Sequence, residues 1–339
     1  MKKAVILFLL SGLFISALHA QDIHFSQFNA FPSSMNPAQT GLFFGDIRLS
    51  AIYRNQWFSV PVHYNTAGVS GEMKFWNNKT GRVNLSGGFI LQFDRAGDSR
   101  FTAYQIGWNQ TVGFRFGKEM RSTLQLGFHL GGMFRTMAWD RLRFDEQWNG
   151  DVYDPNIPTS EVFPTQWINS LDVGTGIAYR WAKNRRNFFT LGVGILHLNR
   201  PTQSWFQQND VRLDPRYSAQ ARGQVRLIGN LDLVGDFLYQ RQDTKQEIAF
   251  GIYPKIYIYR SGKSLVALNV GMYYRVKDAL WPLLGVDYNE FSVNLTYDIN
   301  LSPFRNATRS NGGVEISVVY TLERLIKMDR SYKYCPAFL

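Results

Sequence analysis

An alternation of apolar and polar residues, repeating every second position along almost the whole chain after residue 20, is the feature that most constrains the fold. In residues 101–116 one set of alternate positions carries mostly aromatic and branched side chains, and the other carries small and polar ones. In residues 291–301 the alternation is nearly perfect. Because successive side chains of a β-strand point to opposite faces, the sequence predicts long strands with one apolar and one polar face.

The pattern marks fourteen such segments, and many of them are longer than ten residues. They lie near residues 47–58, 63–76, 82–95, 100–117, 122–138, 167–181, 187–199, 217–228, 230–242, 245–260, 264–276, 280–288, 290–301 and 313–323. Strands of a secreted β-sandwich, the soluble alternative, usually have five or six residues. An even number of long two-faced strands is typical of a bacterial outer-membrane barrel, because only a closed sheet satisfies every backbone N–H and C=O in lipid. We therefore predict an all-β transmembrane antiparallel β-barrel of about 14 strands.

The chain begins with the features of a secretory signal. Lys2 and Lys3 precede an apolar run, and the small-residue stretch 17–20 offers a cleavage site after Ala20. After residue 20 no stretch of about 18 apolar residues follows, which argues against a transmembrane helix. We expect a signal peptide at 1–20, a periplasmic or lumenal segment at 21–46, the barrel at 47–324 and a periplasmic tail at 325–339. The single cysteine, Cys335, offers no disulfide framework.

Charge and connection lengths add two expectations. The 37 Lys and Arg residues exceed the 26 Asp and Glu residues, but the excess is scattered, so we expect no nucleic-acid partner. The connections between the predicted strands differ in length. Two of them, residues 139–166 and 200–216, are much longer than the others. Since barrels usually have short periplasmic turns and long outer loops, these two stretches are candidate extracellular or lumen-folding loops.

The sequence offers no catalytic, cofactor or metal site. Histidines that follow the signal, His24, His63, His129 and His197, are scattered, and none belongs to a cluster with metal-ligand spacing. His129 is interpreted as a polar residue facing the lumen. We find no phosphate-binding loop and no nucleophile elbow. An outer-membrane enzyme would need a His–Ser or His–Asp pair brought together at one rim by the fold.

Two sets of residues are candidates for the interior. The segment 22–45 is polar and lacks the alternation, so it either plugs the lumen or lies along the periplasmic rim as a docking strand. Polar and charged side chains on the inward faces of neighbouring strands are expected to pair and to stiffen a narrow interior. These lumenal residues are Arg222, Arg226, Asp232, Asp236, Asn294 and Asp298.

Motifs at both ends of the chain carry a resemblance to a known family. The beginning contains Asp22, residues 25–28 (FSQF), 36–38 (NPA), Gly41 and 53–57 (YRNQW). The end contains residues 297–300 (YDIN), 312–317 (GGVEIS) and 335–338 (CPAF), where Ala337 replaces the arginine that the family usually has. This series resembles the PorP/SprF family.

The resemblance implies an outer-membrane component of the type IX secretion system of Bacteroidota, linked to adhesin secretion and gliding motility. Its implied partners are other secretion components, the C-terminal domain of a secreted adhesin, and outer-membrane lipid. It implies no catalytic residue, no cofactor and no small-molecule substrate. Candidate partner-binding or plug residues within the N-terminal motifs are Phe25, Gln27, Phe28, Asn36, Pro37 and Gly41.

Two functions therefore compete. The first is an interaction protein that anchors secretion or motility partners, or aids surface attachment of adhesin cargo. The second is an outer-membrane transporter of hydrophobic small solutes, since barrels of this strand number can admit such solutes through a plugged lumen. A transporter needs a continuous apolar pocket, whereas the inward faces here are polar. The sequence thus favours the interaction protein.

Overall fold

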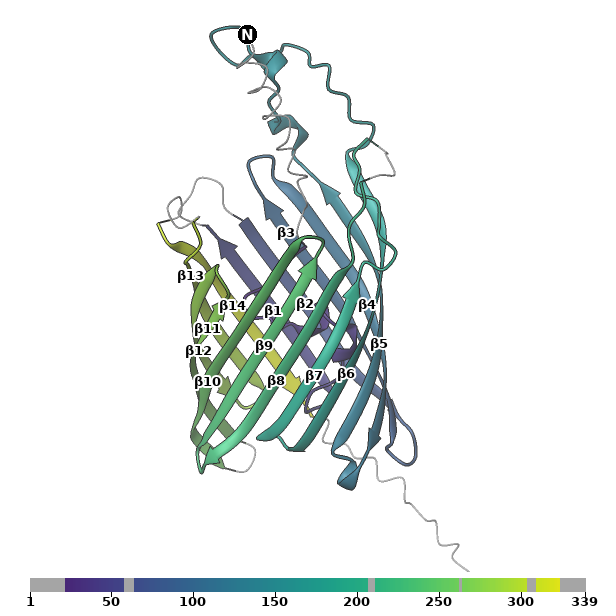
Figure 1. Cartoon of the computed structure of the whole chain (residues 1–339), viewed down its shortest axis with the longest axis vertical. Coiled ribbons are helices and arrows are strands. Elements are labelled where there is room, and N and C mark those ends of the chain that lie inside the picture. Colours follow the sequence, from purple (N-terminus) through teal and green to yellow (C-terminus); the bar gives the residue numbers. More distant parts are fainter. Residues whose placement is uncertain (1–21, 58–63, 207–210, 262–263, 304–308, 324–339) are drawn as a thin grey trace, which may run out of the picture.

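A computed structural model describes residues 22–57, 64–206, 211–261, 264–303 and 309–323. They form one closed barrel in which each of fourteen strands is antiparallel to its neighbours and β1 pairs with β14 (Figure 1). The strands are β1 Ile47–Gln56, β2 Tyr64–Asn77, β3 Val83–Ala96, β4 Phe101–Phe116, β5 Ser122–Thr136, β6 Trp167–Asn184, β7 Asn187–Leu196, β8 Arg216–Ile228, β9 Leu231–Gln242, β10 Lys245–Ser261, β11 Ser264–Arg275, β12 Ala279–Tyr288, β13 Phe291–Asn300 and β14 Asn311–Leu322. The predicted fold is confirmed.

The strand ends differ from the predicted ones by a few residues. The strand β6 continues to Asn184 because a bulge between Ala182 and Asn184 lets it run into a two-residue turn. The strand β7 ends at Leu196, since the next residue, His197, has a positive φ of 59° that breaks the extended backbone. The predicted signal peptide, the tail 325–339 and His63 lie outside the described residues.

The barrel wall is apolar outside and polar inside, as the alternation predicts. In β5, Leu126, Phe128 and Leu130 point outward and are 47–49% exposed, whereas Gln125 and His129, at alternate positions, are buried. Such a surface suits hydrocarbon, and the polar groups collect in the lumen. No helix among the described residues is long and apolar enough to cross a membrane.

The two ends of the barrel differ in the length of their connections. At one end, which we call the short-turn rim, β6 joins β7 and β8 joins β9 through two residues each, and the chain enters β1 and leaves β14 there. At the other end, the long-loop rim, residues 137–166 and 197–215 connect β5 to β6 and β7 to β8. The long-loop rim is uppermost in Figure 1.

The two long connections pack against each other through aromatic rings. Trp139 meets Trp205 edge-on with ring centroids 5.1 Å apart, and Phe163 lies 5.3 Å from Phe206. Phe163 also contacts Trp139 at 4.6 Å. We call this group, Trp139, Phe163, Trp205 and Phe206, the aromatic cluster. It joins two loops that are distant in sequence into one structure at the long-loop rim.

A charge on the outer wall should oppose membrane folding. We expect Leu130→Arg, in the middle of β5, to destabilise the membrane-inserted barrel by about 2–4 kcal/mol, because a guanidinium near the bilayer midplane loses its hydration. Folding into lipid vesicles, followed by gel mobility, measures the effect. Val162→Arg, at a 74% exposed position in the long loop, is the control and should fold like the wild type. Equal loss in both variants would contradict a lipid-facing β5.

Candidate functional site

Residues 22–45, which we call the plug, fill the lumen. They contain no strand, and two single-turn 3-10 helices, η1 Pro32–Ser34 and η2 Pro37–Gln39, fold them compactly. Each helix begins at a proline, whose fixed φ suits a first helical position. Figure 1 shows this purple segment inside the cylinder. The plug leaves β1 at the short-turn rim and extends to Asp22, whose N–H donates to Gln242 at the end of β9 on the long-loop side.

Apolar contacts hold the upper half of the plug. Phe25 packs edge-on against Phe31 with ring centroids 5.8 Å apart, and Phe28 packs edge-on against Tyr273 of β11 at 6.0 Å. Phe28 belongs to the buried apolar cluster that includes Trp281 of β12. The interior is therefore polar but not uniformly so, and the two predicted phenylalanines lie in its apolar patches.

Glycines of the wall make room for the NPA motif. A Cβ on Gly127 would lie 2.3 Å from the backbone nitrogen of Ala38, and one on Gly176 would lie 2.0 Å from Oδ1 of Asn36. The same Asn36 oxygen accepts a 2.9 Å hydrogen bond from the Ala38 N–H and caps η2. The backbone of the plug thus approaches the wall so closely that no side chain fits between them.

Glu315 of β14 binds the backbone of the FSQF motif. Its carboxylate accepts hydrogen bonds from the N–H of Ser26 at 2.8 Å and of Gln27 at 2.6 Å. The Gln27 amide also donates to Thr296 at 3.2 Å and accepts from Ser317 at 2.6 Å. A buried carboxylate that accepts several N–H bonds is well satisfied, so this contact fixes the position of the plug.

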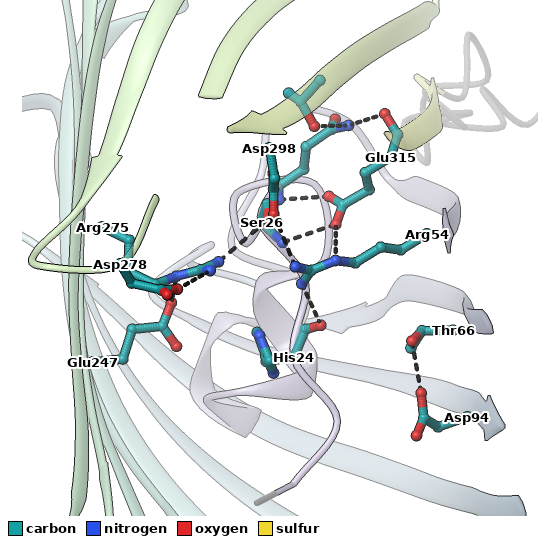
Figure 2. Close-up of polar contacts among 12 residues, drawn as sticks. His24, Ser26, Arg54, Thr66, Asp94, Glu247, Arg275, Asp278, Asp298 and Glu315 are labelled. Carbon is teal, nitrogen blue, oxygen red and sulfur yellow. Dashed lines mark hydrogen bonds and ion pairs between the residues drawn. The ribbon is translucent and has the colours of Figure 1, made fainter. Parts of the chain in front are cut away.

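Arg54 of β1, from the YRNQW motif, lies beside this carboxylate. Its Nη2 is 2.8 Å from Asp298 Oδ2 and its Nε is 4.0 Å from Glu315. Figure 2 shows Ser26 between this group and a second one, in which Arg275 pairs with Glu247 at 2.7 Å. The Ser26 hydroxyl donates to Asp298 at 2.7 Å and accepts from Arg275 at 3.3 Å.

Glu72 of β2 fastens the lower half of the plug. It accepts the Gly41 N–H at 2.9 Å and the Ser33 hydroxyl at 3.3 Å, and it pairs with Arg48 at 2.7 Å. Gly41 has a φ of +80°, and a Cβ there would lie 2.4 Å from Ser86. Only glycine therefore suits this position.

The N-terminal end of the plug is held by ionisable groups near the long-loop rim. His197, just beyond the last residue of β7, lies between Asp22 at 2.7 Å and Asp172 at 2.8 Å, and Arg216 is 3.0 Å from Asp22. Burial disfavours the protonated ring, but the Asp22 charge and hydrogen bonds with both carboxylates outweigh it and raise the pKa of His197 to about 9. Burial opposes ionisation of Asp22 as well, yet Arg216 and His197 hold the pKa of Asp22 well below its usual range.

The fold brings together histidines that are scattered in sequence. His129 Nε2 lies 3.5 Å from Oδ2 of Asp172, whose Oδ1 contacts His197, and its Nδ1 lies 2.6 Å from Asn109 Oδ1. This His–Asp group does not resemble a nucleophile-activating site, because both ring nitrogens of His197 face carboxylates. The adjoining cavity has a volume of about 20 Å³, which is about the size of one water molecule.

Only some of the predicted lumenal residues pair with a residue on the neighbouring strand. Arg222 and Asp236, opposite each other on β8 and β9, lie 3.4 Å apart. Arg226 also lies opposite Asp232, but that carboxylate instead accepts from Nε of Arg186, in the β6–β7 turn, at 2.8 Å. Two further predicted residues pair elsewhere: Asp298 pairs with Arg54, and Asn294 donates to Ser292 at 3.3 Å and to Ser317 at 3.5 Å.

A cavity of about 1000 Å³ remains between the plug and the short-turn rim. Its wall carries twice as many basic as acidic side chains. The basic residues are Arg48, Arg180, Arg185, Arg186, Arg222, Arg226, Lys255 and Arg260, and the acidic ones are Asp236, Asp287, Glu290 and Glu323. We call it the basic cavity.

Four residues that hold the plug are not among the site residues predicted from the sequence: Asp22, Arg54, Glu72 and Glu315. Three of them, Asp22, Arg54 and Glu315, stand inside the terminal motifs, so the motifs contained a signal for them. Glu72 is marked only by its charge within a strand, on the face opposite to Phe75 and Met73. Its position, a charged residue on the inward face of a strand, is the only feature of the sequence that indicates a contact inside the barrel.

Loss of the contacts of Arg54 with Asp298 and Glu315 should destabilise the barrel. We expect Arg54→Met to lower the free energy of unfolding by about 3–5 kcal/mol, because Asp298 and Glu315 would remain buried without their cation. The temperature at which the detergent-solubilised barrel loses its compact gel mobility measures this. Arg185→Met, which removes the exposed Arg185–Glu323 pair, should change that temperature little. A similar shift in both variants would refute the assigned role of Arg54.

The His197 contacts predict a pH dependence. Because the folded pKa of about 9 exceeds the unfolded value of 6.5, this histidine stabilises the fold fully below pH 6.5 and loses its contribution as the pH rises through about 9. The unfolding temperature of the wild type should therefore fall over this interval more than that of His197→Asn. Asparagine is the chosen replacement because it tolerates a positive φ. Parallel profiles of the two proteins would contradict the prediction.

Comparisons with known proteins agree with the barrel and identify the family. No curated protein matches the sequence. Among solved structures, the toluene transporter TbuX of Ralstonia pickettii has a TM-score of 0.51 at 10% identity, with 85% of this chain and 92% of that chain covered. A FadL homologue of Pseudomonas aeruginosa has a TM-score of 0.46 at 10% identity, with 85% and 93% covered. At such identity the likeness to TbuX shows the fold alone. The family model for the type IX secretion system membrane protein PorP/SprF matches residues 17–320, so this chain belongs to that family and is a protein of the outer membrane.

Proposed function

We propose that this outer-membrane barrel is a non-enzymatic component of the type IX secretion system that anchors adhesin-type cargo, or aids its surface attachment, through protein contacts. The observation that carries the proposal is the plug, which occupies the lumen and is bonded to the wall. Glu315 of β14 and Glu72 of β2, the two strands that flank β1, bind the backbone of the plug, and His197 binds Asp22 at its end. In a barrel filled in this way, the two rims are the surfaces that partner proteins can contact.

The long-loop rim supplies the surface for cargo. In the loop 137–166, Trp148 is 58% exposed, Val152 59% and Val162 74%. The aromatic cluster gives this loop a fixed support by packing it against the connection 197–215. Exposed aromatic and apolar residues on an ordered support are typical of protein interfaces.

The competing function is transport of hydrophobic solutes. The name of TbuX describes a toluene transporter, but that property belongs to TbuX and its likeness to this chain extends to the fold. A solute path would need an apolar lining along the lumen. The basic cavity instead carries eight Lys and Arg side chains, which favours the anchoring function.

A deletion strain distinguishes the two functions. We expect deletion of the gene, in a strain without a redundant paralogue, to abolish surface display of a specific adhesin while uptake of toluene stays unchanged. Antibody binding to intact cells measures display, and uptake of labelled toluene measures transport. Normal display in the deletion strain would count against anchoring, and lost uptake would favour transport.

Complementation with loop variants tests the long-loop rim. Phe163→Ala removes a ring that contacts both Trp139 and Phe206, so the loop 137–166 should lose its support and display should fall several-fold. Phe163→Tyr keeps the ring and should restore display. Barrel levels in the outer membrane must be equal in both strains. Full display with Phe163→Ala at normal barrel levels would place the cargo contact elsewhere.

A further inference from the structure

The basic cavity contains a buried cation without a carboxylate partner. Arg180 of β6 is 7% exposed, and no described carboxylate lies within 4 Å of its guanidinium. It donates one hydrogen bond, from Nη1 to the Leu42 carbonyl of the plug at 2.7 Å, and its Nε has no partner. The rings of Phe44 and Phe188 cover it at 4.1 and 5.0 Å. A buried charge with so few partners is costly, which points to an anion that completes the site.

The other cations of the cavity wall divide into paired and unpaired groups. Arg48 pairs with Glu72, Arg186 with Asp232, and Arg222 with Asp236. Arg226 and Arg260 line the same cavity and form no ion pair with a described carboxylate. The surplus of positive charge is therefore carried by Arg180 deep in the cavity and by Arg226 and Arg260 closer to its mouth.

The positions of these cations favour an extended ligand. Arg180 is level with Arg222 through Thr190 of β7, and Arg226 is four residues further along β8, so Arg180 and Arg226 are about 13 Å apart in the strand direction. Arg180 lies on β6 and Arg260 on β10, so the positive charge is spread around the wall as well. One small anion cannot contact such a set, whereas an extended peptide of about four to six residues, at about 3.3 Å per residue, has the required length.

Access to the cavity is from the short-turn rim. Its wall includes Arg185 in the β6–β7 turn and Asn289 and Glu290 in the β12–β13 turn, and residues 28–30 and 42–44 of the plug also line it. Short turns of outer-membrane barrels face the periplasm. A ligand would therefore approach from the side opposite to the exposed loops.

We propose that the basic cavity binds an extended acidic peptide segment of a periplasmic partner protein, with one carboxylate on Arg180 and others on Arg226 and Arg260. The segment enters from the short-turn rim, and the carboxylate on Arg180 lies beside Leu42 and Phe44, which contact that arginine. This inference goes beyond cargo anchoring at the long-loop rim, and its test is a binding measurement that does not depend on the outcome of the display assay.

The test uses the full-length barrel in neutral detergent and a fluorescein-labelled hexaglutamate peptide, with binding followed by anisotropy. We expect hexaglutamate to bind and hexaglutamine not to bind, and the affinity to fall as salt screens the charges. Arg180→Gln should weaken binding by roughly tenfold or more, because it removes the buried cation that has no carboxylate partner. Equal binding of the two peptides would overturn the proposal.

Two further variants keep the test independent of folding. The double variant Arg226→Gln/Arg260→Gln changes exposed side chains, so it should fold normally and weaken hexaglutamate binding several-fold. Arg100→Gln, an exposed position at the long-loop rim, is the charge-matched control for Arg180→Gln and should bind like the wild type. Wild-type affinity in the double variant would overturn the proposal. So would displacement of the peptide by inorganic phosphate at equal charge concentration, since that result would indicate a small-anion site.

Discussion

The structure depends on the need of every backbone N–H and C=O in lipid to find a partner within the chain. Closing β1 onto β14 meets that need, because the sheet then has no free edge. Closure also decides what the interior must contain. Eight strands leave a space that side chains can fill, whereas fourteen leave more room than that. The plug supplies the missing volume, and its backbone brings further polar groups that the inward faces of the strands must satisfy.

The contacts of the plug are polar where its backbone needs partners and apolar where aromatic side chains gather. Glu315 and Glu72 accept backbone N–H groups, and Arg54 balances Glu315 and Asp298. In surroundings of low dielectric such groups are strongly coupled, so removal of one leaves another buried without a partner. The plug and the wall therefore form one cooperative unit in which neither part is satisfied alone.

The strands could be predicted from the sequence because the two-residue period is a local property, and their bounds agree within a few residues. The contacts inside could not be predicted in the same way. Arg226 and Asp232 lie opposite each other on neighbouring strands, yet Asp232 binds Arg186, whose side chain comes from a turn. Asp22 and His197 are 175 residues apart and meet only because the plug crosses the lumen, a path that no alternation encodes. The terminal motifs pointed to the plug segment but did not predict which residues of the wall it contacts.

The arrangement of buried charges also bears on what can pass through the barrel. Displacing the plug would strip Glu315 and Glu72 of the N–H groups they bind, and it would separate Asp22 from His197 and Arg216. An apolar solute has no charge or hydrogen-bonding group to replace those contacts, and each unpartnered buried charge costs several kcal/mol by order of magnitude. Contacts at the rims require no such loss. The energetics of the interior thus favour a barrel that works through its two ends, with exposed aromatic loops on one side and a basic cavity on the other.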